Sequence, residues 1–449
     1  MRLKLLFLAV ALSVTALPSH AEDLLGAYRE ARANDPVLAQ ADATRLSTGE
    51  GVSQARALLL PQISGGLTLS QTNGGGGTTL VDSNNPGQNI PTDVYGHTRQ
   101  RNLSGTLSQT IFDFSKFANL KAAHSAADAQ DEVYDAAQQD LFVRVATAYF
   151  TVLTSEDALA FAKANEDAFH QQYEQANQQY KVGLSAITNM YQAKAFYEAA
   201  KAQTITAQNT LNDAREALTQ ITGKPTVALK KLREDLPLQP PSPDNQEAWV
   251  KQALQTNPNL LAQQDNVDTA EHNITAARAG HLPTITAQVS YNKTATWYQA
   301  ANFGSERPGA TTIGLTLNVP IFSGGLTQSQ VRQSIYQRDS ATDSMEIERR
   351  QIVRDTLNYY RSVIAGIAQV QSAKSSVESG QKAVEAMRAG FDVGTQTLTD
   401  VLLAIQTLTS SESTYSQARH QFILNKLLLK QAAGTVALDD VQAINALLE

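Results

Sequence analysis

Few side chains in this sequence have the types and spacing that catalysis needs. Ser379 and Lys382 fit the S-x-x-K spacing, in which a lysine activates a serine nucleophile, but no S-D-N or K-T-G segment accompanies them. The seven histidines are scattered, and the sequence contains no H-E-x-x-H motif. Cysteine is absent, which removes thiolate nucleophiles and thiolate metal ligands. The sequence therefore predicts no catalytic residues and no enzyme.

Two further segments resemble ligand-binding loops in composition only. Residues 74–77 are four glycines, but the Lys-Ser/Thr pair of a phosphate-binding loop does not follow them. Asp82-Ser83-Asn84-Asn85 offers oxygen ligands without the spacing of a calcium loop, and is predicted to be a solvated loop tip. No cofactor and no metal site is predicted.

The first residues have the features of a secretory signal peptide. Arg2 and Lys4 precede a short apolar stretch at residues 5–14, and Ser19-His20-Ala21 is a small-residue cleavage site. We predict a signal peptide over residues 1–21; a retained anchor is the alternative, but the stretch is short for a membrane span. Removing it leaves 34 basic and 43 acidic residues, a net charge of −9, which gives no general attraction for nucleic acid.

The remaining chain contains an internal repeat, which indicates how its elements are organised. Pro36 matches Pro258 at an offset of 222 residues, and Gly183 matches Gly394 at an offset of 211. The change in offset lies in the strand-and-loop section, where insertions are tolerated. We predict a first repeat over residues 22–223, a proline-rich linker over 224–246, a second repeat over 247–434, and a C-terminal segment over 435–449. The linker and the C-terminal segment are both assigned to an equatorial region.

Each repeat contains two segments in which apolar residues alternate with small or polar ones. These are residues 63–70, 103–111, 285–291 and 313–321, with polar loops predicted at 72–100 and 292–311. Such runs are typical of transmembrane β-barrels, and a soluble β-sandwich is the alternative. No run of about 18 apolar residues follows the signal peptide, so a transmembrane helix is not predicted. Four strands cannot close a barrel and an open edge is not viable in lipid, so several protomers must pool their strands.

Segments with a helical pattern, among them the longest stretches without glycine or proline, are predicted to be helices. Residues 23–59 have a helical pattern that ends before Pro61, and residues 115–182 form an uninterrupted stretch of 68 residues. Such a helix would be roughly 100 Å long. Gly183 then reverses the chain into a second helix over 184–222. In the second repeat, apolar residues recur at intervals of seven, which is coiled-coil spacing: Val363, Val370, Val377, Val384 and Phe391.

A twofold repeat of helix, β-hairpin and long helix pair after a signal peptide resembles the TolC family of outer-membrane efflux proteins. The resemblance extends from about residue 23 to residue 434. The motifs that carry it are Leu59-Leu60-Pro61-Gln62, Gln109-Thr110-Ile111-Phe112-Asp113, Ala146-Thr147-Ala148-Tyr149-Phe150, Val182-Gly183-Leu184, Gly280-His281-Leu282-Pro283-Thr284, Pro320-Ile321, Gly324-Gly325 and Val393-Gly394-Thr395.

This resemblance implies a membrane protein of mixed α/β fold. Three protomers would contribute four strands each to one twelve-stranded transmembrane β-barrel, continued by a long α-helical coiled-coil tunnel. The barrel would lie in the outer membrane of a Gram-negative bacterium and the tunnel in the periplasm. The implied function is a passive exit duct for tripartite efflux or type I secretion. Its implied partners are a periplasmic adaptor protein and an inner-membrane pump of the ABC, RND or MFS class. A non-conducting coiled-coil scaffold or adhesin is the alternative function.

The resemblance also implies the residues of a periplasmic gate. Asp400 matches an acidic ring position, where three carboxylates would favour cations and raise one another's pKa by repulsion. The family's second acidic position is Leu403 here, so an apolar ring would lie beside the acidic one. Of the latch positions, Thr188 is kept, and the others depart from the family pattern in losing charge or a hydroxyl group: Asn189, Phe391 and Gln396. The hairpin ends, where adaptors dock, match Gly183-Leu184 and Gly394-Thr395.

Overall fold

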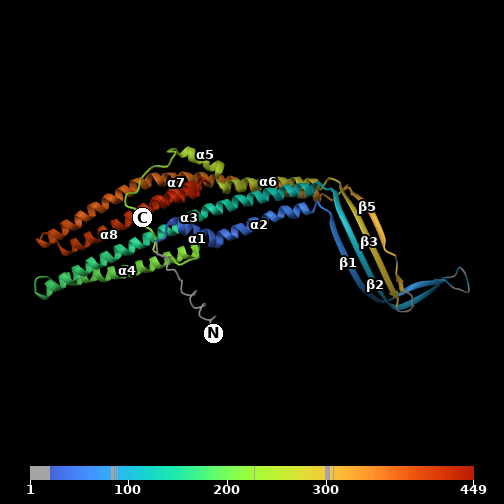
Figure 1. Cartoon of the computed structure of the whole chain (residues 1–449), viewed down its shortest axis with the longest axis horizontal. Coiled ribbons are helices and arrows are strands. Elements are labelled where there is room, and N and C mark those ends of the chain that lie inside the picture. The colour runs from blue at the N-terminus through green and yellow to red at the C-terminus, as the bar shows by residue number, and fades with distance from the viewer. Residues whose placement is uncertain are drawn as a thin grey trace, which may run out of the picture. The chain divides into compact units, whose positions relative to one another are not determined.

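The computed structural model describes residues 21–81, 85, 87, 89–226, 228–298, 304–306 and 308–449. Residues 1–20 of the predicted signal peptide lie outside this range, as do three residues of the predicted loop tip at 82–85. In chain order (Figure 1) the elements are α1 (Leu24–Asn34), α2 (Pro36–Ala57), β1 (Gln62–Val81), β2 (Asn89–Phe112), α3 (Phe114–Lys181), α4 (Ile187–Thr222), α5 (Gln246–Thr256), α6 (Pro258–Ala279), β3 (Thr284–Tyr298), β4 (Gly304–Glu306), β5 (Ala310–Asn318), α7 (Leu326–Asp392), α8 (Leu398–Ala432) and α9 (Leu438–Asn445).

The chain forms two compact units, each assembled from separate stretches of sequence. One contains the described residues of Met1–Arg45 together with Gln130–Gln263 and Met345–Glu449. The other contains Leu46–Ala129 and Gln264–Ser344, and includes the five strands found among the described residues. The long helices α3 and α7 each contribute residues to both units.

The helix predicted over residues 23–59 is divided into α1 and α2. Asp23 caps the start of α1, where its Oδ1 accepts a hydrogen bond from Gly26 N–H at 2.7 Å. Pro36 disfavours helical backbone at the residue before it, and Asp35 is extended with ψ of 118°. The prediction of one continuous helix is therefore wrong at this position. The same break separates α5 from α6 before Pro258.

The long helices end in tight turns at two glycines. Gly183 has φ of 79°, a left-handed conformation that costs little without a Cβ atom. Leu184 N–H donates to Gln179 O at 2.8 Å, the pattern that closes a Schellman motif. Gly394, with φ of 81°, ends α7 in the same way. Each pair of helices, α3 with α4 and α7 with α8, therefore forms an antiparallel hairpin (Figure 1).

The main core lies in the helical unit, around the middle of α3. Tyr149 and Phe150 are 0% and 1% exposed, and Tyr28 stacks on Phe142 with ring centroids 4.2 Å apart. Of the residues predicted at sevenfold spacing in α7, three are buried in the two clusters of this unit: Val363, Val370 and Val384. Burial of these apolar side chains is the main term that holds the long helices together.

The linker between the repeats is held by both ends of the described chain. Glu22 N–H donates to Ala228 O at 2.8 Å, and Lys230 N–H donates to Glu22 O at 3.1 Å. Lys231 and Glu449 exchange two backbone hydrogen bonds, of 3.1 and 2.9 Å. The hydroxyl group of Tyr149 donates toward Glu22 O and Lys230 O, which fixes this junction on the core.

The strands form one antiparallel sheet in the order β1-β2-β3, with β5 and the short β4 both paired to β3. Two details of the prediction are wrong. The sheet has five strands rather than four, because residues 304–306 pair with β3. The strands are also longer than predicted. β1 and β2 continue through most of the predicted loop at 72–100, including the glycine run, where Gly74 pairs with Gly96. β3 continues to Tyr298, through the first part of the predicted loop at 292–311.

Candidate functional site

Cross-strand pairing arranges the sheet into alternating apolar and polar rows. Ile63 on β1 lies opposite Leu107 on β2, which lies opposite Val289 on β3, which lies opposite Ile313 on β5. The next row consists of four hydroxyl side chains in the same order: Ser64, Thr106, Ser290 and Thr312. Because successive residues of a strand point to opposite faces, one face of the sheet is apolar and the other is polar.

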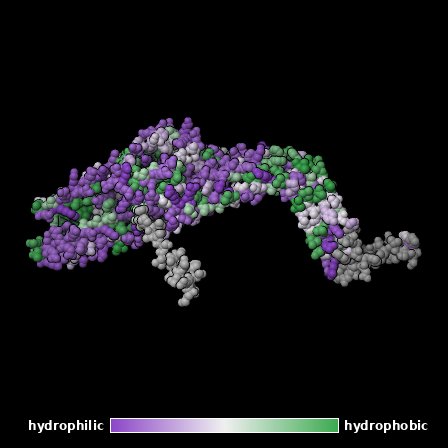
Figure 2. All heavy atoms as spheres, viewed as in Figure 1, coloured by the Kyte–Doolittle hydropathy of each residue, from purple (hydrophilic) through white to green (hydrophobic). Residues whose placement is uncertain are grey.

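The apolar face of this sheet is open in the single chain. Ile63 is 83% exposed and Ile313 is 78% exposed, and neighbouring apolar residues are exposed as well: Leu67, Leu69, Leu103, Leu315 and Leu317. In Figure 2 hydrophobic residues gather at the end of the strands that lies next to α2 and α6. A contiguous apolar surface of this kind marks contact with lipid or protein.

The sheet also has two edge strands in the part of the chain that the structure describes. β1 pairs only with β2, and β5 pairs only with β3. The outer backbone groups of β1 and β5 therefore remain available for pairing with further strands. Across the described residues, no helix is both long enough and apolar enough to cross a membrane.

The far ends of the two helical hairpins form a second exposed apolar region. Val182 and Leu184 are 68% and 80% exposed at the end of α3, and Val393 is 76% exposed at the end of α7. Figure 2 shows hydrophobic residues at both hairpin ends. The predicted docking residues Gly183, Leu184, Gly394 and Thr395 lie at these ends, and all four are exposed.

Asp400 lies in the first turn of α8 and forms a capping box with Thr397. Its Oδ2 accepts hydrogen bonds from Thr397 N–H at 2.9 Å and from the Thr397 hydroxyl at 2.6 Å. These two hydrogen bonds lower the pKa of Asp400 in the single chain. The expected rise in pKa requires carboxylates of other protomers and stays a prediction. Leu403 is 48% exposed one turn later on α8, and its place in an apolar ring stays a prediction.

The predicted latch residues are distributed over both hairpins. Thr188 is exposed at the start of α4, and the side-chain amide of Asn189 donates to Ser185 Oγ at 3.1 Å. Phe391 packs against the cluster formed by Val384, Leu398, Val401 and Leu402. Gln396 is exposed in the turn before α8. Within one chain, the structure shows no hydrogen bond joining Asn189 to Gln396 among these described residues.

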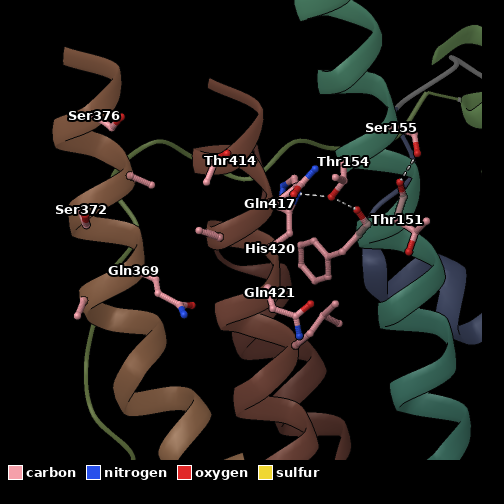
Figure 3. A pocket seen from close by; sticks show the side chains of 15 residues that line it. Thr151, Thr154, Ser155, Gln369, Ser372, Ser376, Thr414, Gln417, His420 and Gln421 are labelled. Atoms are coloured by element: carbon pink, nitrogen blue, oxygen red, sulfur yellow. Dashed lines mark hydrogen bonds between the residues drawn. The ribbon is translucent and has the colours of Figure 1, made fainter. Parts of the chain in front are cut away.

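A polar groove of about 990 Å³ lies in the helical unit between α3, α7 and α8. Nine of its fifteen lining residues carry a hydroxyl or amide group, including Thr151, Gln369, Ser372 and Gln417, and apolar residues such as Phe150 and Leu424 lie between them (Figure 3). One ionisable side chain, His420, also lines the groove, and it is only 5% exposed. Sequence reasoning did not single out His420, because a lone histidine in a helix carries no spacing signal.

The described residues contain no cluster of His, Cys, Asp and Glu side chains that could hold a metal ion. Ser379 and Lys382, the pair with S-x-x-K spacing, lie in α7 and are both exposed to solvent. The exposed apolar surfaces of the sheet and of the hairpin ends suit a membrane-embedded conduit.

Comparison with known proteins also indicates a membrane-embedded conduit. The family model described as "Outer membrane efflux protein" matches residues 27–224 and 249–435. The chain is 35% identical over 444 residues to outer membrane protein TolC of Vibrio cholerae, covering 98% of this chain and 97% of that one. It is 33% identical over 453 residues to TolC of Escherichia coli, covering 98% of this chain and 88% of that one.

Solved structures share this fold at low sequence identity. The Campylobacter jejuni CmeC outer membrane channel superposes with a TM-score of 0.76 at 16% identity, covering 95% of this chain and 90% of that one. The structure of CusC superposes with a TM-score of 0.75 at 18% identity, covering 93% of both chains.

A two-faced sheet joined to long helical hairpins defines an outer-membrane channel protein with a periplasmic helical tunnel. The chain belongs to the outer membrane efflux protein family.

Proposed function

We propose that this chain is one protomer of a homotrimeric exit duct. Three sheets would join edge to edge, β1 of one protomer beside β5 of the next, and close a barrel built on twelve long strands. The observation that carries this proposal is the sheet itself, which has one apolar face and two open edges. Closing the barrel would remove both edges and direct the apolar rows to lipid. The two-repeat division at residues 223 and 247 is part of this proposal.

The duct serves efflux and type I secretion and holds no energy source of its own. Relatives of this chain include the alkaline protease secretion protein AprF of Pseudomonas aeruginosa and the cobalt-zinc-cadmium resistance protein CzcC of Cupriavidus metallidurans. We propose that a periplasmic adaptor docks on the exposed hairpin ends at Gly183-Leu184 and Gly394-Thr395. An inner-membrane pump of the ABC, RND or MFS class would supply cargo and energy.

At the periplasmic end, we propose a constriction formed by rings of Asp400 and Leu403. The acidic ring would select cations, and the apolar ring would oppose the passage of hydrated ions. Thr188, Asn189, Phe391 and Gln396 would hold the closed state through packing and neutral hydrogen bonds between protomers. Because no ion pair is involved, this closure should be less sensitive to salt than a charged latch.

Two measurements on the purified protein test the duct. A conducting trimer should migrate as a heat-resistant trimer in detergent and produce single-channel currents in a planar bilayer. Stable trimers without conductance would instead identify a non-conducting scaffold. Monomers in detergent that is mild enough to preserve related channels would contradict the pooled barrel.

The two faces of the sheet should respond differently to charge. Leu67→Lys places a charge among exposed apolar residues of the proposed lipid face, where it costs about 1–3 kcal/mol depending on depth. Thr68→Lys places the same charge on the polar face, opposite Asn102, and should be tolerated. The measurement is the yield of heat-resistant trimer in outer-membrane fractions. Equal yields for the two variants would refute the assignment of the faces.

Asp400→Ala should reduce cation selectivity in planar-bilayer recordings, because the variant removes three carboxylates from the constriction. The same change removes the capping box, so Thr397→Ala is the matched control: it deletes the hydroxyl partner and keeps the carboxylate. Thr397→Ala should retain selectivity. Unchanged selectivity in Asp400→Ala would remove Asp400 from the pore.

A further inference from the structure

Helices α3 and α8 are joined across the repeats by three side-chain hydrogen bonds in regular register. Thr154 Oγ1 lies 2.7 Å from His420 Nδ1, Ser416 Oγ donates to Asp157 Oδ2 at 2.7 Å, and Thr409 Oγ1 donates to Asn165 Oδ1 at 3.3 Å. The partners advance along α3 as they recede along α8, as an antiparallel pair requires. We call this row of three hydrogen bonds the α3–α8 seam. Figure 3 shows its His420 end, beside the polar groove.

The hydrogen bonds of Thr154 identify the donor in this first pair. Its hydroxyl group donates to Phe150 O at 2.7 Å, so its single proton is already used. His420 Nδ1 must then carry a proton and donate to Thr154 Oγ1. This geometry is complete with a neutral imidazole ring, because the neutral tautomer already supplies the one donor that the seam needs.

A second proton would put a positive charge on a ring with little access to water. His420 is 5% exposed, and its ring centroid lies 5.4 Å from that of Phe150. The burial lowers the pKa of His420 to about 4, although the charge of Asp157 acts in the opposite direction.

The charged groups around this ring have defined partners of their own. On α3, Asp157 accepts from Ser416 and lies 3.8 Å from Lys231 Nζ. On α8, the positive charge of Arg419 opposes protonation of His420. The Arg419 guanidinium donates to the carbonyl oxygens of Leu232 and Arg233. The α7 residues that line the groove are Ala, Gln and Ser, so this helix adds no charge there.

We propose that the α3–α8 seam is an acid-sensitive latch between the two repeats, with His420 as its titrating member. At neutral pH the ring is uncharged, packs on Phe150 and donates to Thr154. In acid, a charged ring favours any state in which it reaches water, and the nearest such state separates α8 from α3 beside the polar groove. This device goes beyond the proposed function, and it does not depend on cargo, pump or adaptor.

The sign of the effect follows from the direction of the shift. Because the pKa of His420 is lower in the folded state, His420 stabilises the closed seam least in acid. This stabilisation begins to fall near the ordinary histidine pKa of 6.5 and stops falling near pH 4. Between pH 7 and pH 5, the opening equilibrium of the seam should rise on the order of 20-fold.

Hydrogen–deuterium exchange of the full-length trimer at pH 7 and pH 5 tests the latch. Comparing proteins at the same pH cancels the intrinsic pH dependence of exchange. At pH 5, peptides spanning residues 150–160 and 412–424 should exchange faster in the wild type than in His420→Gln, and at pH 7 the two should agree. His281→Gln, at an exposed histidine outside the helical unit, is the control and should behave as the wild type.

A second variant guards against misfolding of the first. His420→Phe keeps an aromatic ring beside Phe150 and cannot titrate, so it too should lack the acid response. Two results would overturn the latch. In the first, the His420 variants exchange as fast as the wild type in these peptides at pH 5. In the second, the acid-induced rise in the wild type is equally large in α4 peptides around Leu211. Neither result would bear on the exit duct, which is tested by trimer formation and conductance.

Discussion

Arg144→Met is expected to lower the free energy of unfolding by about 3 kcal/mol at pH 7. Arg144 Nη2 lies 2.7 Å from Asp35 Oδ2, and the Asp35 side chain is 2% exposed, so the variant leaves a buried carboxylate without its cation. Because 26% of the Arg144 side chain is exposed, the lower end of the usual range applies. Urea-induced unfolding monitored by circular dichroism measures the loss.

The pH dependence of this loss gives a second check. Burial opposes ionisation of Asp35, but hydrogen bonds from Arg144 and from Leu38 N–H outweigh it and hold its pKa below the usual range. The ion pair therefore stabilises the fold above about pH 4 and is lost as pH falls below that value. The difference between the variant and the wild type should therefore shrink as the pH falls below about 4.

Arg45→Met is the matched control for Arg144→Met. Arg45 also contacts two carboxylates, Asp42 at 2.9 Å and Asp131 at 3.4 Å, but all three side chains are substantially exposed. Ion pairs in water contribute little, so this variant should leave the unfolding midpoint unchanged within error. Equal stability of the two arginine variants would show that the burial of Asp35 does not increase the contribution of the Arg144 ion pair to folding.

Gly434→Ala is expected to cost about 2–5 kcal/mol, because two effects combine. The residue has φ of 68°, which strains any side chain, and an added Cβ would lie 2.2 Å from Thr256 O. The obstructing atom belongs to the backbone. It is also held in place, because Thr256 Oγ1 donates to Ala433 O and Asn257 Nδ2 donates to Ala432 O, at 2.7 and 2.9 Å. The yield of folded trimer and its urea midpoint report the change.

Two other glycines separate the two effects. Gly183 has φ of 79° and open space around it, so Gly183→Ala should show backbone strain alone, about 1–2 kcal/mol. Gly223 is the repeat equivalent of Gly434, but its added Cβ would lie 3.0 Å from Asn34 Cβ, a contact that a shift of a few tenths of an ångström would relieve. Gly223→Ala should therefore fall between the other two. If Gly434→Ala lowered the free energy of unfolding by no more than Gly183→Ala, the backbone at the α5–α6 junction would have to move to make room for the Cβ atom.

Sequence periodicity predicted those parts of the fold where side chains alternate or recur. The helix expected over residues 115–182 is α3 to within one residue at each end. The strands were predicted too short, because Gly74–Gly77 have no side chains and so show no alternation, although their backbones pair normally. The break at Asp35 was missed, although the effect of Pro36 on the preceding residue could have been read from the sequence.

The candidate site was predictable to the extent that it depends on local sequence. Thr397 and Asp400 have the spacing of a capping box, so the hydrogen-bonded state of this carboxylate could have been anticipated from four residues. His420 was different, since its partner Thr154 lies 266 residues away and neither position carries a pattern. Contacts of that range depend on how the two repeats pack, which no window of sequence contains.

The linker between the repeats forms isolated β-bridges with the first and the last described parts of the chain, at Leu229 and at Leu232. It pairs with Glu22 through Ala228 and Lys230, and with Glu449 through Lys231. Closing this junction requires residues separated by almost the entire chain, which is slow for entropic reasons. During biosynthesis the helical hairpins can form as soon as each is complete, whereas the junction cannot close before Glu449 has been made. We therefore expect a folding intermediate with paired helices and an unpaired linker, and protection of the linker amides should mark the last step of maturation.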